Sequence, residues 1–124
     1  MDLALQEGAD YHIEIVNDPQ AGGFRLELVS SASRTFCLAN NHWPSAGGWM
    51  DHQGEPQVWV SSGDRRYPMI EHNMGYCMSD CPAARVTPGQ SITAFIPYDR
   101  FVGLETPPME GAELHIRPIA YRCR

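Results

Sequence analysis

The sequence contains no lysine, and all nine of its basic residues are arginine. The 15 acidic residues outnumber them and give a formal net charge of -6 with histidine neutral. Because nucleic acids and anionic membranes bind through clustered cations, an acidic chain without a basic cluster argues against both as partners. The missing lysine is typical of codon bias in a GC-rich genome, and a selected role for arginine in bidentate contacts is the alternative.

Motifs that identify common enzyme classes are also missing. The chain has no glycine-rich phosphate loop, no nucleophile elbow and no H-E-x-x-H helix. A catalytic triad is spatial and leaves no fixed sequence pattern, but neither Cys77 nor Cys81 has a specific activating neighbour. We therefore expect a protein that is not an enzyme and that holds no cofactor.

Long apolar runs are absent as well. No segment approaches the roughly 20 apolar residues that a membrane-spanning helix needs. Residues 1–10 have neither the basic nor the apolar region of a signal peptide, and we expect them to form a flexible leader. The chain is then either cytosolic or the mature form of an exported protein with a new initiator methionine.

The cysteines favour the exported form. Cys37, Cys77, Cys81 and Cys123 are an even number in a small, loop-rich chain, which is typical of a disulfide framework. More than one pairing is possible, and the sequence does not choose among them. We favour Cys77–Cys81 as a local clip and Cys37–Cys123 as a link between an early strand and the last one. Four free thiols in a cytosolic protein are the alternative. The expected location is periplasmic or secreted.

What the sequence does contain is a series of short stretches in which apolar and polar residues alternate. Residues 11–15, 24–28 and 113–117 repeat with a period of two, which sends successive side chains to opposite faces of a strand. The expected strands are 11–16, 24–29, 35–38, 57–60, 65–70, 92–96 and 112–121. They predict an all-β fold, specifically an immunoglobulin-like antiparallel β-sandwich of about seven strands, in one domain over residues 11–124.

One turn and the strand after it carry a resemblance. Pro88-Gly89-Gln90-Ser91 leads into an alternating strand and then Tyr98, and Gly111 precedes the final strand. This succession resembles small bacterial immunoglobulin-like domains, namely the intracellular proteinase inhibitor family and the pro-domains of deuterolysin-type peptidases. Ala112 and Glu113 depart from it, because an aromatic residue is expected there. The resemblance implies a non-catalytic domain that binds or restrains another protein, and it transfers no individual functional residue.

Two predicted loops, 40–52 and 71–84, hold the candidate binding surface. Large aromatic side chains on loops are typical anchors for a partner protein. We expect these loops to lie at one end of the sandwich and to act by occlusion, as an inhibitor or an immunity-type factor does. The side chains expected to reach the partner are Trp43, Trp49, His72, Met74 and Tyr76.

The tryptophans also have a structural interpretation. One of them, Trp43 or Trp59, is expected to pack between the sheets. Trp59 stands between Val58 and Val60, so if both valines face inward, Trp59 faces outward.

Two other functions remain open. A Cu(I) carrier would use thioether and imidazole ligands, which the chain offers at Met69, His72, Met74 and Met78. A carbohydrate-binding module would use Trp43 and Trp49 as stacking platforms.

Overall fold

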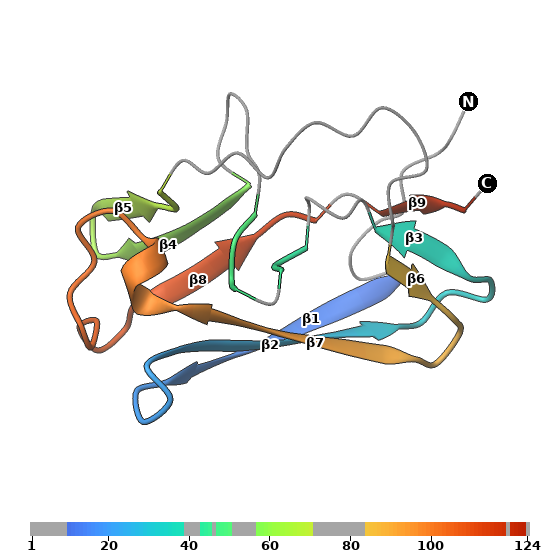
Figure 1. The fold of residues 1–124 in the computed structure, drawn as a ribbon, viewed down its shortest axis with the longest axis horizontal. Helices are drawn as coiled ribbons and strands as arrows, with labels where there is room; N and C mark the ends of the chain where they lie inside the picture. The colour runs from blue at the N-terminus through green and yellow to red at the C-terminus, as the bar shows by residue number, and fades with distance from the viewer. Residues whose placement is uncertain are drawn as a thin grey trace.

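Alternating apolar and polar residues form antiparallel strands in the computed structural model of the chain (Figure 1). The structure describes residues 10–38, 43–45, 47–50, 57–70, 84–118 and 120–123. Its strands are β1 (Tyr11–Asp18), β2 (Gly23–Ser30), β3 (Phe36–Leu38), β4 (Val58–Ser62), β5 (Arg65–Pro68), β6 (Ala84–Val86), β7 (Ser91–Pro97), β8 (Glu113–Ile116) and β9 (Ala120–Arg122). A short 3₁₀ helix, η1 (Tyr98–Arg100), follows β7. The predicted all-β class is confirmed.

The described strands form three antiparallel sheets, β1-β2-β7, β5-β4-β8 and β6-β3-β9. Figure 1 shows the first as a long layer at the bottom, with the other two above it at the left and the right. About seven strands were expected, and the described residues contain nine. Within these ranges no helix is long and apolar enough to cross a membrane.

The single last strand expected over residues 112–121 is in fact two strands in different sheets. β8 pairs with β4, whereas β9 pairs with β3. Pro118 lies between them, and β8 and β9 are both outermost in their sheets, a position at which a proline without a backbone N–H is tolerated. The other strand absent from the sequence prediction, β6, is too short to show a period.

The core follows the alternation most clearly at β2, the middle strand of the long sheet. Phe24, Leu26 and Leu28 are at most 2% exposed, whereas Arg25 between them is exposed. Burying such a side chain contributes roughly 1.5–3 kcal/mol. The rest of the buried cluster comes from all three sheets and the segments between them: Tyr11, Phe36, Leu38, Trp43, Met50, Val58, Val60, Met69, Val86, Ile96, Tyr98, Phe101, Leu114, Ile116 and Ala120.

Cys37 and Cys123 form a disulfide, which confirms the long-range pairing favoured from the sequence. Cys37 lies in β3, Cys123 follows β9, and their Cα atoms are 5.1 Å apart. The bond joins positions separated by 86 residues, so it closes most of the chain into a loop. The other expected bond, Cys77–Cys81, lies outside the described residues, as does all of the expected leader before Asp10.

Tyr98 in η1 connects the end of β7 to the end of β1. Its side chain is 2% exposed and packs edge-on against Phe24, with 5.3 Å between the ring centroids. Its phenol donates a hydrogen bond to Asn17 Oδ1. Burial, and to a smaller extent the negative charge of Asp18, raises the pKa of Tyr98 above its usual value of 10.0.

Replacing both cysteines of the disulfide, Cys37→Ala together with Cys123→Ala, should lower the free energy of unfolding. A loop of this length predicts a loss of about 4–5 kcal/mol from chain entropy alone. Urea denaturation without a reducing agent measures the loss, since a reductant would also act on Cys77 and Cys81. An unchanged denaturation midpoint would contradict the stabilising role of the bond.

The raised pKa of Tyr98 predicts a loss of stability at alkaline pH. The folded state favours the neutral phenol, so this contribution is complete below pH 10.0 and is lost as the pH rises through the folded-state pKa. Tyr98→Phe should lose about 1 kcal/mol near neutrality with the hydrogen bond to Asn17, and its stability should fall less steeply in alkali. Denaturant titrations across the alkaline range measure both slopes, and parallel curves would contradict the prediction.

Candidate functional site

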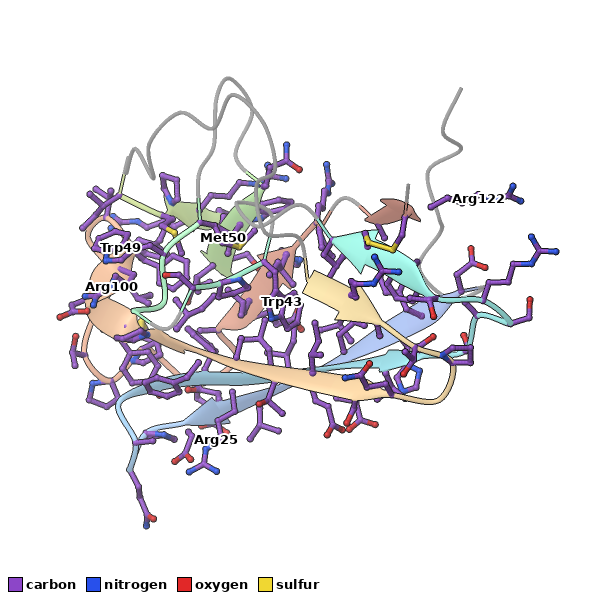
Figure 2. All side chains as sticks on the ribbon, turned by 45° about the vertical axis from the view of Figure 1, so that its right-hand side comes forward. Arg25, Trp43, Trp49, Met50, Arg100 and Arg122 are labelled. Carbon is purple, nitrogen blue, oxygen red and sulfur yellow. A yellow bond between two sulfur atoms is a disulfide. The ribbon has the colours of Figure 1, made fainter. Side chains whose placement is uncertain are left out.

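Trp43 and Trp49 lie in the described stretches 43–45 and 47–50, close to the core. The structure places Trp43 inside the core at 7% exposed rather than at a partner surface, so the structural interpretation of this tryptophan is the correct one. Trp49 is half-buried, and the guanidinium carbon of Arg100 lies 4.5 Å from its ring centroid (Figure 2). Arg100 Nε also donates to the Gly47 carbonyl oxygen at 3.1 Å. Trp43 is therefore buried, and Arg100 covers part of the Trp49 indole.

Almost all of the second predicted loop, 71–84, lies outside the described residues. Met69, one of the copper candidates, is 1% exposed, and its sulfur accepts a hydrogen bond from the Met50 N–H at 3.4 Å. Among the described residues, no three His, Cys, Asp or Glu side chains form a group that could hold a metal ion. The remaining candidates for partner or copper binding lie outside the described residues and stay predictions: His72, Met74, Tyr76 and Met78.

A different tryptophan, Trp59, lies at the centre of a cluster on the outer face of the sheet β5-β4-β8. Val58 and Val60 are fully buried, which turns Trp59 to the opposite face, as the valine argument predicts. Its side chain is nevertheless only 7% exposed, because neighbouring side chains cover it. The guanidinium carbons of Arg66 and Arg117 lie 5.3 and 4.9 Å from its ring centroid, as in cation–π contacts.

His115 stacks on the same indole from the neighbouring strand. The two ring centroids are 5.1 Å apart and the ring planes differ by 14°. The strand register explains the contact, because Trp59 and His115 lie directly opposite each other in the β4–β8 pair. Ser61 Oγ lies 2.8 Å from His115 Nε2, a hydrogen bond that orients the imidazole. We call Trp59, Arg66, His115 and Arg117 the arginine–tryptophan cluster.

The strand that carries His115 has an open edge. β8 is outermost in its sheet, so one side of its backbone has no strand partner among the described residues. The Arg117 N–H donates to the Gln57 carbonyl oxygen at 2.8 Å, which shows that the backbone of Arg117 faces β4. Backbone direction alternates along an antiparallel strand, so His115 also faces β4. The backbone groups of Leu114 and Ile116 therefore point to the open edge.

β1 is an outer strand of the long sheet, and its other edge has no strand partner in the described ranges. The Ser31 N–H donates to the Asp10 carbonyl oxygen at 2.9 Å, so the even-numbered residues of β1 direct their backbone groups to β2. The backbone groups of Ile13 and Ile15 therefore point outward. Ile15 is 36% exposed, although its side chain lies on the same face of the sheet as the core residue Leu26.

The two open edges border one groove, which we call the edge groove. Figure 1 shows β8 above β1, and side chains of both strands line a cavity of about 280 Å³ between them. Apolar side chains form the inner part, and three members of the arginine–tryptophan cluster, Trp59, His115 and Arg117, form the outer wall. The lining residues are Ile13, Ile15, Trp59, Leu114, His115, Ile116 and Arg117.

Two other arginines of the described chain form ion pairs, whereas the two arginines of the cluster do not. Arg25 forms an ion pair with Asp18 at 2.7 Å (Arg25 is labelled in Figure 2), and Arg100 forms one at 2.8 Å with its neighbouring aspartate. Among the described residues, no carboxylate lies within salt-bridge distance of Arg66 or Arg117. The edge groove therefore combines apolar surface with the guanidinium group of Arg117, which has no anionic partner in the described ranges.

Sequence reasoning did not identify His115 or Arg117 as site residues. Two signals were present, since His115 and Arg117 share one face of the alternating stretch 113–117 and Trp59 faces outward. The missing information was the register that brings these strands together. No family model matches the chain, and no curated protein or solved structure is significantly similar to it.

Arg117→Ala should uncover the indole of Trp59. We expect stronger quenching of tryptophan fluorescence by acrylamide and a loss of about 0.5–1 kcal/mol in the free energy of unfolding, as for an exposed cation–π contact. Arg122→Ala is the matched control, because Arg122 is an exposed arginine of β9 in a different sheet. Equal quenching of the two variants would contradict the covering role of Arg117.

Proposed function

We propose that the chain is a non-catalytic protein-binding module that receives an extended segment of a partner along the edge of β8. The observation that carries the proposal is the outward-facing backbone of Leu114 and Ile116 beside the edge groove. A segment that pairs with these groups adds a strand to the sheet β5-β4-β8, which is the recognition mode known as β-augmentation.

The geometry sets the strength of such binding. Leu114 and Ile116 each present one donor and one acceptor, and a net hydrogen bond contributes about 0.5–1.5 kcal/mol. Four such bonds contribute about 2–6 kcal/mol, which does not offset the roughly 4–15 kcal/mol lost in translational and rotational freedom on association. Side chains that enter the edge groove must supply the rest, so the partner is selected by side chains and held by backbone pairing.

This mechanism agrees with the action expected from the sequence, which is occlusion. A partner segment that is held as a strand is withdrawn from its other interactions, as an inhibitor or immunity-type factor requires. The loops 40–52 and 71–84 would then form a second contact region. We also propose that the long sheet and the two smaller sheets above it are a divided form of an immunoglobulin-like sandwich, which the layers in Figure 1 support.

We place this function in an oxidising compartment, the periplasm or the cell exterior. The disulfide between Cys37 and Cys123 supports this location, because such bonds persist where thiols are not kept reduced.

The test uses three synthetic peptides in which valine alternates with glutamate, threonine or lysine. Each peptide is titrated into the isotopically labelled full chain, and amide hydrogen exchange is followed by NMR. Strand addition should slow exchange at Leu114 and Ile116, because their N–H groups gain acceptors. Amides of β2 serve as the internal control, since both neighbours of that strand are already present.

Methylating alternate amide nitrogens of the peptide removes the hydrogen-bond donors from one edge of its strand. Two such peptides are possible, methylated at odd or at even positions, and one of them should give no protection at Leu114 and Ile116. Protection by none of the three peptides at millimolar concentration would overturn the proposed function. The same holds for protection that appears only outside β8.

A further inference from the structure

We infer that the partner segment is acidic, with aspartate or glutamate alternating with apolar residues, and that its carboxylates bind at the arginine–tryptophan cluster. This inference rests on the proposed strand addition at β8. It names the chemistry of the segment and the positions at which that chemistry is recognised.

The pleat of the sheet determines which side chains of an added strand meet which surface. Residues opposite Leu114 and Ile116 share their face and enter the apolar part of the edge groove, beside Ile13 and Ile15. A residue opposite His115 lies on the outer face with the cluster. Because His115 directs its backbone to β4, this is a non-hydrogen-bonded position, where opposing side chains approach most closely.

Charge then selects the residue type at the outer positions. A carboxylate opposite His115 has the imidazole directly across the strand and the Arg117 guanidinium on the diagonal, within reach of a long side chain. A lysine at the same position would face that guanidinium and be repelled. Glu113 stands at the start of β8 and disfavours a further acid opposite itself, so the acidic positions are those opposite His115 and Arg117.

The stacked arrangement also prepares the cations for a carboxylate. A guanidinium that packs on an indole through its face keeps its in-plane N–H donors available for bidentate hydrogen bonds. Contact with Trp59 restricts the Arg117 side chain before the partner arrives, so less entropy is lost on binding. Arg66 places a second positive charge at the same ring.

The competing edge at β1 has the opposite charge on its outer face. Glu14 lies there, directly opposite Glu27 of β2. Arg25 lies on the same face but forms an ion pair with Asp18 at 2.7 Å, and His12 Nε2 is 3.9 Å from Glu14 Oε1. An acidic strand is repelled from this edge, so it adds to β8 in preference to β1.

The experiment measures the dissociation constants of the three alternating peptides with the full chain. The glutamate peptide should bind about threefold to tenfold more tightly than the threonine peptide, the range that cross-strand charge pairs provide, and the lysine peptide should bind most weakly. Added salt should reduce the advantage of glutamate. Arg117→Gln should lower the preference for glutamate over threonine, as should Arg66→Gln, and the control Arg122→Gln should retain it.

The outcomes separate the two proposals. Equal affinity for the glutamate and threonine peptides, with protection at Leu114 and Ile116, would overturn the acidic specificity and leave strand addition intact. A full glutamate preference in folded Arg117→Gln and Arg66→Gln, verified by their amide spectra, would also overturn it. If no peptide protects the β8 amides, the proposed function itself fails.

Discussion

The division of the C-terminal segment at Pro118 between two sheets is the constraint on which this part of the structure depends. Before this residue β8 pairs with β4, and after it the chain crosses to pair with β3 as β9. The crossing brings Cys123 to Cys37 and leaves β8 as a short outer strand near β1. The disulfide and the edge groove are therefore two results of one break in a strand.

β8 is fixed by packing on both of its faces while its edge remains open. On the inner face, Leu114 and Ile116 are 6% and 7% exposed and belong to the core. On the outer face, the His115 ring is held by Trp59 and by the hydrogen bond with Ser61. The backbone groups at the edge therefore have defined positions without a partner strand, and such order before binding reduces the entropy lost on association.

Local patterns predicted much of the fold, whereas long-range pairing was out of their reach. The period-two stretches at 11–16 and 24–29 are confirmed because each leaves a sign in neighbouring residues. The pairing of Cys37 with Cys123 is also confirmed, but it was one of several that an even number of cysteines allows. The division at Pro118 depends on which strands β8 and β9 pair with, and no local sequence pattern specifies those partners. The same limit applies to the site. The outward orientation of Trp59 was predictable from the flanking valines, but the contact of its ring with side chains from β8, far away in the sequence, was not.

The open edge of β1 has a further consequence, for self-association. β1 is eight residues long, and backbone groups on one of its sides have no strand partner in the described ranges, so another chain could pair with them. Ile15 and Val16 add exposed apolar surface at 36% and 57%. Long, apolar edges of this kind template aggregation unless charges interrupt them. Glu14 stands between these residues and Ile13, where a second copy would bring the same carboxylate. The charge that turns an acidic partner away from β1 thus also disfavours pairing of this edge with a second copy in which Glu14 faces Glu14.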